Sequence, residues 1–89
     1  MAFLGAFQSG SGLILRVRWT LDPASMPITG STLTLVHRDG TTLGPTAGTP
    51  DGVADAYRAL ATPSKAGRWY VRWATLPGGG ATNDSIYVQ

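Results

Sequence analysis

The sequence predicts an all-β fold, a small antiparallel β-sandwich of six or seven short strands. Several segments alternate apolar and polar residues with a period of two, which is the pattern of a strand with one buried face. Turn signals built from Gly, Pro and Asp separate these segments at intervals of roughly ten residues. Glu is absent and Lys occurs once, whereas Gly occurs 12 times and Thr is frequent. This composition disfavours helices and suits strands joined by turns.

The strongest strand pattern follows a turn at residues 63–67. Three apolar residues alternate there with two arginines and a tyrosine, in the order Arg68, Trp69, Tyr70, Val71, Arg72, Trp73. Two Trp side chains on one face would each bury about 150–250 Å². We therefore expect this strand to lie at the centre of the core, covered by a second layer.

The chain divides into a short N-terminal arm, residues 1–12, and a sandwich domain, residues 13–89. The arm carries Phe3, Leu4 and Phe7 ahead of a flexible Gln-Ser-Gly-Ser-Gly joint. Gly5 and the lack of Lys or Arg argue against a signal peptide, and no run approaches the ~20 apolar residues of a membrane span. Two interpretations stay open. The three apolar side chains fold back over the domain's own core, or the arm docks on a neighbouring subunit.

The remaining strands follow from the same alternation. Residues 13–21 form the first strand, which Asp22-Pro23 ends because proline lacks an N–H and restricts the residue before it. Further strands are expected at 31–38, at 41–43 after the Asp39-Gly40 turn, at 53–61 and at 83–89. Loops are expected at 24–30 and 44–52, and a flexible hairpin tip at 76–80. The four alanines of 53–61 also tolerate a helical turn, but a strand fits better.

No constellation of residues predicts an enzyme or a cofactor. His37 and Asp39 have the spacing of a base and its orienting acid, but Asp39 is expected to shape the Asp-Gly turn instead. One His, no Cys and five Asp do not assemble a metal site of three or four protein ligands. Asp51 and Asp55 lack the Asp-rich spacing of a calcium loop. We expect no catalytic, metal or cofactor-binding residue.

The charges exclude a polybasic tract. The net charge is only +2, and the basic residues are spread from residue 16 to residue 72, so neither nucleic acid nor a membrane is expected as a partner. Arginines and one tyrosine share the polar faces of two strands that are candidate neighbours: Arg16, Arg18, Arg68, Tyr70 and Arg72. Two interpretations stay open here too. The residues form a partner-binding face, or a solvated face with Arg stems over Trp edges.

The order of motifs resembles a known family over about residues 13–89. The motifs are Leu-x-Val-x-Trp, Leu-Thr-Leu before Asp-Gly-Thr-Thr, Tyr-x-Ala-Leu-Ala-Thr-Pro, Ala-Gly-Arg-Trp-Tyr-Val-Arg-Trp, Gly-Gly-Gly-Ala and a terminal Asp-Ser-Ile-Tyr-Val. They resemble the small immunoglobulin-like structural proteins of tailed bacteriophage virions. The resemblance implies an immunoglobulin-like sandwich that assembles in the host cytoplasm into the virion. It implies a head decoration or cement protein, or a head-to-tail junction component, in symmetric contact with the major capsid protein or with connector proteins.

Two other functions remain as alternatives. A glycan- or host-surface-binding immunoglobulin-like module would use exposed aromatic residues, for which Tyr57, Tyr70 and Tyr87 are the candidates. An accessory domain of a bacterial surface protein would share the motif Pro-x-x-x-Gly-x-Trp-x-Val-x-Trp. Binding to purified capsids without affinity for glycans separates the virion protein from the glycan-binding module.

Overall fold

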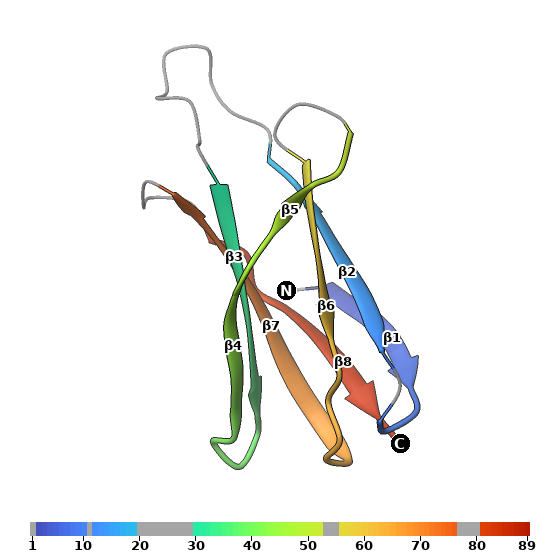
Figure 1. The fold of residues 1–89 in the computed structure, drawn as a ribbon. Coiled ribbons are helices and arrows are strands. Elements are labelled where there is room, and N and C mark those ends of the chain that lie inside the picture. The colour runs from blue at the N-terminus through green and yellow to red at the C-terminus, as the bar shows by residue number, and fades with distance from the viewer. Residues whose placement is uncertain (1, 11, 20–29, 53–55, 77–80) are drawn as a thin grey trace.

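The fold consists of strands arranged in two sheets (Figure 1). The computed structural model describes residues 2–10, 12–19, 30–52, 56–76 and 81–89, and none of them is helical. The strands are β1 (Ala2–Phe7), β2 (Leu13–Arg18), β3 (Gly30–His37), β4 (Thr42–Ala47), β5 (Thr49–Pro50), β6 (Ala56–Ala61), β7 (Gly67–Leu76) and β8 (Asp84–Val88).

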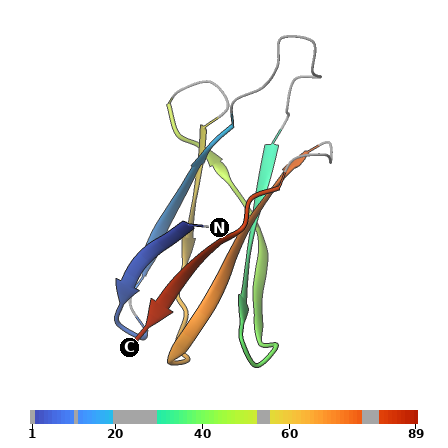
Figure 2. The ribbon, with the colours of Figure 1, turned by 180° about the vertical axis from the view of Figure 1, so that it is seen from behind.

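A five-stranded sheet and a three-stranded sheet make up the two layers. The order is β1-β8-β7-β3-β4 in the larger sheet and β2-β6-β5 in the smaller one. β1 runs parallel to β8, whereas every other neighbouring pair is antiparallel. The view from behind shows β1 and β8 side by side at one edge of the larger sheet (Figure 2). The all-β, mostly antiparallel architecture expected from the period-two patterns is therefore confirmed.

The Trp-containing strand β7 is the central strand of the larger sheet, as expected. Its inward residues Trp69, Val71 and Trp73 are each 1% exposed. The smaller sheet contributes buried side chains to the same core, which comprises Leu13, Leu15, Leu33, Leu35, Tyr57, Ala59, Trp69, Val71, Trp73, Ile86 and Val88. Apolar side chains from both sheets thus form one continuous core.

A chain of hydrogen bonds ties the sheets together near one end of the core. Trp19, directly after β2, donates from its indole Nε1 to Ser31 Oγ over 3.2 Å. Ser31 on β3 donates in turn to the backbone oxygen of Ala74 on β7, over 3.0 Å. Ser31 is 2% exposed, so its hydroxyl is satisfied by protein groups rather than left unpaired in the core. In a chain without Cys, this polar link joins the two layers.

The described residues form eight strands where six or seven were expected for the chain. The segment expected as an arm contains β1, and the segment expected as a long loop contains most of β4 and all of β5. Gly44 allows β4 to continue, because a Cβ there would lie 2.6 Å from the backbone oxygen of Leu33 and the residue has φ +95°. Only glycine tolerates both conditions. The helical alternative for 53–61 is wrong from Ala56 onward, where β6 begins.

Three predicted features lie wholly or partly outside the residues that the structure describes. The end of the first predicted strand, most of the loop at 24–30 and the hairpin tip at 77–80 lie outside the described residues. The described part of β2 ends at Arg18, ahead of the predicted end at residue 21.

Candidate functional site

The two phenylalanines of β1 point to opposite faces of the larger sheet. Phe3 pairs in register with Ser85, and Phe7 pairs with Val88, with a register shift between them. Four residues apart on a regular strand, the two rings would share a face. Gly5, at φ +127°, provides the positive φ that such a bulge uses. The extra residue in β1 therefore separates the two aromatic side chains.

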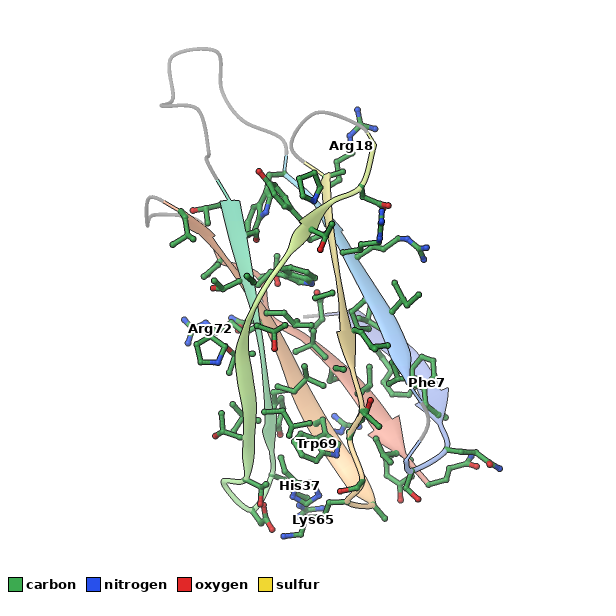
Figure 3. All side chains as sticks on the ribbon, viewed as in Figure 1. Phe7, Arg18, His37, Lys65, Trp69 and Arg72 are labelled. Atoms are coloured by element: carbon green, nitrogen blue, oxygen red, sulfur yellow. The ribbon has the colours of Figure 1, made fainter. Side chains whose placement is uncertain are left out.

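The two interpretations of the N-terminal apolar residues each describe part of the structure. Phe7 is partly buried and packs against the core (Figure 3), as expected if the segment covered its own domain. Phe3 is 58% exposed and Leu4 is 44% exposed. Of the three residues named as a docking arm, only Phe3 and Leu4 are thus presented to solvent.

The five residues expected on one polar face lie on two opposite faces. Arg68, Tyr70 and Arg72 are the exposed positions of β7 in the larger sheet. Arg16 and Arg18 are exposed positions of β2 in the smaller sheet. The expectation that the two strands are neighbours is wrong, because each strand is covered on its apolar side by the other sheet. The structure brings Arg68, Tyr70 and Arg72 together and separates them from Arg16 and Arg18.

Aromatic and arginine side chains gather on the outer face of the larger sheet. We call this surface the aromatic–arginine face, and it comprises Phe3, Arg38, Arg68, Tyr70, Arg72 and Tyr87. Tyr70 and Tyr87 are 40% and 46% exposed. Arg68 pairs in register with Tyr87, and the backbone N–H of Arg38 donates to the Arg68 oxygen over 3.1 Å. Arg38, Arg68 and Tyr87 therefore meet at one end of the sheet.

Arg38 was missed by the sequence interpretation. It directly follows β3 and stands two residues after the outward-facing Val36. The strand predicted at 31–38 already included Arg38, and the period of two places it on this face.

Two aromatic residues of this face flank a small buried residue, Ser85. Ser85 holds an outward position on β8 yet is only 2% exposed. Its register partners are Phe3 on β1 and Tyr70 on β7. Because a serine is much smaller than either aromatic ring, the neighbouring side chains cover it. Phe3 and Tyr70 thus lie in one register row across the sheet, and Tyr87 lies in the next row beside Arg68.

An open cleft lies on the aromatic–arginine face. Arg38, Arg68, Tyr70 and Tyr87 line it, and its volume is about 540 Å³. Within the residues that the structure describes, Arg38, Arg68 and Arg72 make no ion pair. The cleft therefore presents guanidinium and phenol groups whose donors are available to a partner.

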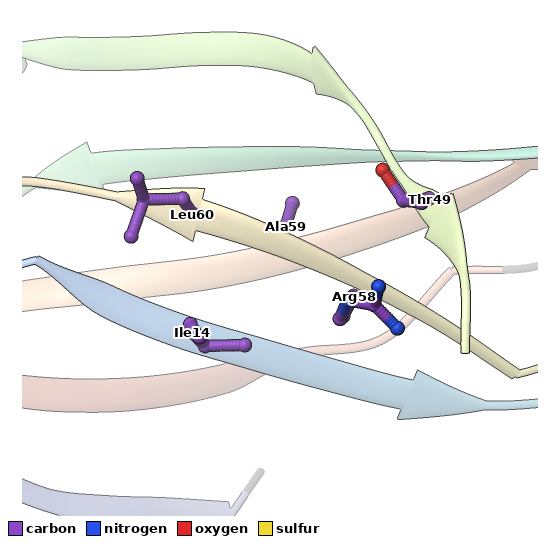
Figure 4. Close-up of a pocket in the computed structure, with 5 residues that line it drawn as sticks. All are labelled: Ile14, Thr49, Arg58, Ala59 and Leu60. Atoms are coloured by element: carbon purple, nitrogen blue, oxygen red, sulfur yellow. The ribbon is translucent and has the colours of Figure 1, made fainter. Parts of the chain in front are cut away.

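The outer face of the smaller sheet carries a different arrangement. Asp51 contacts Arg16 at 3.3 Å and Arg58 at 2.8 Å. Beside them Ile14 and Leu60 pair across β2 and β6 and are 54% and 62% exposed. A shallow cleft of about 230 Å³ runs along this apolar pair, with Thr49 and Ala59 also in its lining (Figure 4). On this face, both arginines next to the cleft already have a carboxylate partner.

His37 is buried and has protein partners at both ring nitrogens. Its side chain is buried, Nε2 lies 2.8 Å from the Ala66 backbone oxygen, and Nδ1 lies 3.1 Å from the Asp39 backbone nitrogen, which donates to it. The ring also contacts Trp69 edge-on, with centroids 5.0 Å apart. The Asp39 carboxylate oxygen Oδ1 also lies 2.9 Å from Nδ1. Both ring nitrogens therefore have protein partners, and the imidazole is screened from solvent.

Asp39 shapes the turn after β3, as expected. Its carboxylate accepts a hydrogen bond from the Thr41 backbone N–H over 2.9 Å and also contacts Lys65. Two hydrogen bonds hold the pKa of Asp39 well below its usual range. The larger effect comes from the Lys65 ammonium, and the next from the Thr41 backbone N–H.

Tyr57 and Asp55 are the remaining residues that the sequence suggested for glycan or metal binding. Tyr57, named for glycan binding, is 9% exposed and belongs to the core, so it is not available to a ligand. Asp55 lies outside the described residues. Within the described ranges no group of three or more His, Cys, Asp or Glu is placed to hold a metal ion. No helix in the described part of the chain is long and apolar enough to cross a membrane.

Comparison of the chain with protein-family models, with curated proteins and with solved structures finds no match.

Proposed function

We propose that the chain is a non-enzymatic structural protein of a tailed bacteriophage virion. In this proposal it has an immunoglobulin-like fold and binds neighbouring capsid or connector proteins, as a head decoration or cement protein or in the head-to-tail junction. The observation that carries the proposal is the aromatic–arginine face. The motif resemblance supplies the virion context, and the face supplies a surface for protein contact.

The strand order supports the immunoglobulin-like part of the proposal. In that fold the first, second, fifth and fourth strands form one sheet and the third, sixth and seventh form the other. The order β2-β6-β5 against β8-β7-β3 corresponds to these strands when β1 is counted as the first strand and β4 as an additional one, whereas β1 itself departs from it by pairing with β8. Two further features depart from antibody domains, because the chain has no Cys and its buried Trp pair lies on β7. The Trp19 to Ser31 hydrogen bond links the sheets instead.

The composition of the aromatic–arginine face supports protein binding over a merely solvated surface. Tyr, Phe and Arg are enriched at protein interfaces, whereas Lys and Glu are depleted. The face carries three arginines and three aromatic residues, and the only Lys of the chain, Lys65, is held elsewhere by Asp39. Tyr supplies contact area at a low cost in side-chain entropy, and the planar guanidinium of Arg loses less entropy per hydrogen bond than the flexible ammonium of Lys.

The position of His37 supports the absence of catalysis. A general base must reach a substrate proton with a free ring nitrogen. Both ring nitrogens of His37 lie within hydrogen-bond distance of backbone atoms, and the chain contains no second histidine.

Sedimentation with particles that lack the protein tests this function. Purified protein is mixed with such particles, the particles are pelleted, and the bound copies are counted per particle. Hundreds of copies are expected for a decoration protein and about a dozen for a ring at the head-to-tail junction. No stoichiometric binding to particles of any assembly stage would refute the proposal.

A glycan- or host-surface-binding module is the second candidate. Tyr70 and Tyr87 flank the open cleft and are both exposed, and exposed aromatic rings stack on sugar faces. Binding to a glycan panel, abolished by Tyr70→Ser and without binding to particles, would favour this candidate.

A further inference from the structure

We infer that the cleft lined by Arg38, Arg68, Tyr70 and Tyr87 binds an acidic segment of a partner protein through its carboxylates. The inference deepens the proposed function by giving the chemistry of the partner, and it rests on that function for the identity of the partner as a virion protein. Its starting point is the unequal distribution of charge over the two outer faces.

The acids that the structure describes are all placed away from the cleft. Asp39 contacts Lys65 at the turn after β3, and Asp51 contacts Arg16 and Arg58 on the smaller sheet. Asp84 holds an inward-facing register position opposite Val71. In the described ranges, the aromatic–arginine face thus has arginine side chains and no Asp side chain.

The backbone holds two arginines of the cleft side by side. Arg38 and Arg68 are joined by a backbone hydrogen bond between the end of β3 and the start of β7, so their Cα positions are fixed by the sheet. A guanidinium donates two parallel hydrogen bonds to one carboxylate, and such charge-assisted bonds are roughly twice as strong as neutral ones. The phenol groups of Tyr70 and Tyr87 add donors at the same place.

The neighbouring residues extend the site from a single anion to a peptide. The cleft is open and has a volume of about 540 Å³, so it suits a chain lying across the sheet rather than an enclosed small molecule. Phe3 lies in the next register row, beyond Ser85, and is 58% exposed. An acidic segment that also carries one aromatic or aliphatic residue would therefore contact the arginines of the cleft and Phe3 at the same time.

Nucleic acid fits the face less well. Binding to a phosphate backbone usually involves about six to ten phosphate contacts. The aromatic–arginine face offers three arginines, and the whole chain has a net charge of only +2.

The test measures binding of a defined acidic peptide by NMR titration of isotope-labelled full-length protein. The probe is the blocked peptide Gly-Glu-Glu-Phe-Glu-Glu-Gly, with a counterpart carrying Gln at every Glu. We expect shifts of the β7 and β8 amides, and affinity that falls as salt is added. We expect Arg68→Gln to weaken binding about tenfold. Arg18→Gln is the matched control, because it removes the same charge from the exposed face of the smaller sheet, and it should leave the affinity within about twofold.

Several outcomes would overturn the inference. Amide shifts confined to β2 and β6 would place the peptide on the other sheet. Equal losses of peptide affinity in Arg68→Gln and Arg18→Gln would show that binding depends only on net charge. Equal affinity for the Gln peptide would exclude carboxylate recognition. Tighter binding of a sialylated glycan or of an oligothymidylate at the same amides would assign the cleft to a different partner class. A thermal melt of each variant confirms that it is folded.

Failure of this inference is distinguishable from failure of the proposed function. If particles bind the protein, and neither excess acidic peptide nor Arg68→Gln reduces the binding, the acidic segment is wrong and the virion function stands. If the acidic peptide binds the cleft and no particle binds the protein, the chemistry of the cleft stands and the virion function is wrong.

Discussion

Arg16 and Arg58 lie directly opposite each other on β2 and β6, and one carboxylate joins them. Asp51 Oδ2 lies 3.3 Å from Arg16 Nε, and Oδ1 lies 2.8 Å from a terminal nitrogen of Arg58. Like charges directly opposite on neighbouring strands destabilise a sheet. Asp51 therefore converts an unfavourable cross-strand pair into a bridged one, and it fixes the chain after β5 to the outer face of the smaller sheet.

Asp51→Asn should destabilise the protein by about 1 kcal/mol, because the arginine pair loses its shared anion. Urea unfolding measures the change, and added salt should reduce it. In the Asp51→Asn background, Arg16→Gln should recover part of the loss because it removes the repulsion. A further loss on adding Arg16→Gln would contradict the bridging role of Asp51.

Gly5→Ala should weaken the pairing of β1 with β8. The residue has φ +127°, a conformation that costs a residue with a Cβ about 1–3 kcal/mol. Hydrogen exchange of the Gln89 amide, which donates to the Phe7 oxygen over 2.8 Å, measures the pairing directly. Gln8→Ala, at an exposed neighbouring position, is the control and should leave the exchange rate unchanged. Unchanged protection in Gly5→Ala would contradict the need for glycine in the bulge.

Ser31→Ala should destabilise the protein by about 1–3 kcal/mol, because it removes the acceptor of the Trp19 indole and the donor to Ala74. Trp19→Phe should cost a similar amount, since it also removes the indole N–H. If the two residues act through their shared hydrogen bond, the double variant should lose less than the sum of the single losses. Strict additivity in chemical unfolding would show that the two sheets are not coupled through this pair.

Acid should remove a stabilising contribution of Asp39. Its pKa is lowered from the ordinary 3.8, chiefly by Lys65, so the folded state favours the carboxylate. The contribution is complete above the ordinary pKa and is lost as the pH falls below it. The melting temperature should therefore drop less between about pH 5 and about pH 2 in Asp39→Asn than in the unchanged protein. Lys65→Met should reduce the acid sensitivity in the same direction. An identical drop in all three proteins would contradict this assignment.

Much of the fold is predictable from local patterns. β2, β3, β7 and β8 each alternate apolar and polar residues, and alternation identifies the buried face of a strand without tertiary information. β1 is different, because Ala-Phe-Leu-Gly-Ala-Phe has no period of two. Its pairing depends on a bulge at Gly5 that places Phe3 outward and Phe7 inward.

For the candidate site, the sequence predicts which side chains face outward but not which strands lie side by side. Alternation assigns Arg16 and Arg72 to outward faces, but it contains no information on which strands are neighbours. The two residues lie on opposite sheets, and the sheet assignment follows from long-range pairing alone. The Asp51 bridge was also missed, since it joins a residue in a predicted loop to two strands.

The most direct measurement of the central claim is particle binding by a variant of the aromatic–arginine face. Tyr70→Ser combined with Tyr87→Ser removes both phenol rings from the cleft without touching the buried core. Arg18→Gln on the opposite sheet is the control. The proposed function predicts that the unchanged protein and the control sediment with particles in equal copy number, and that the folded Tyr variant stays in the supernatant. Full particle binding by the Tyr variant would contradict the assignment of this face as the contact surface.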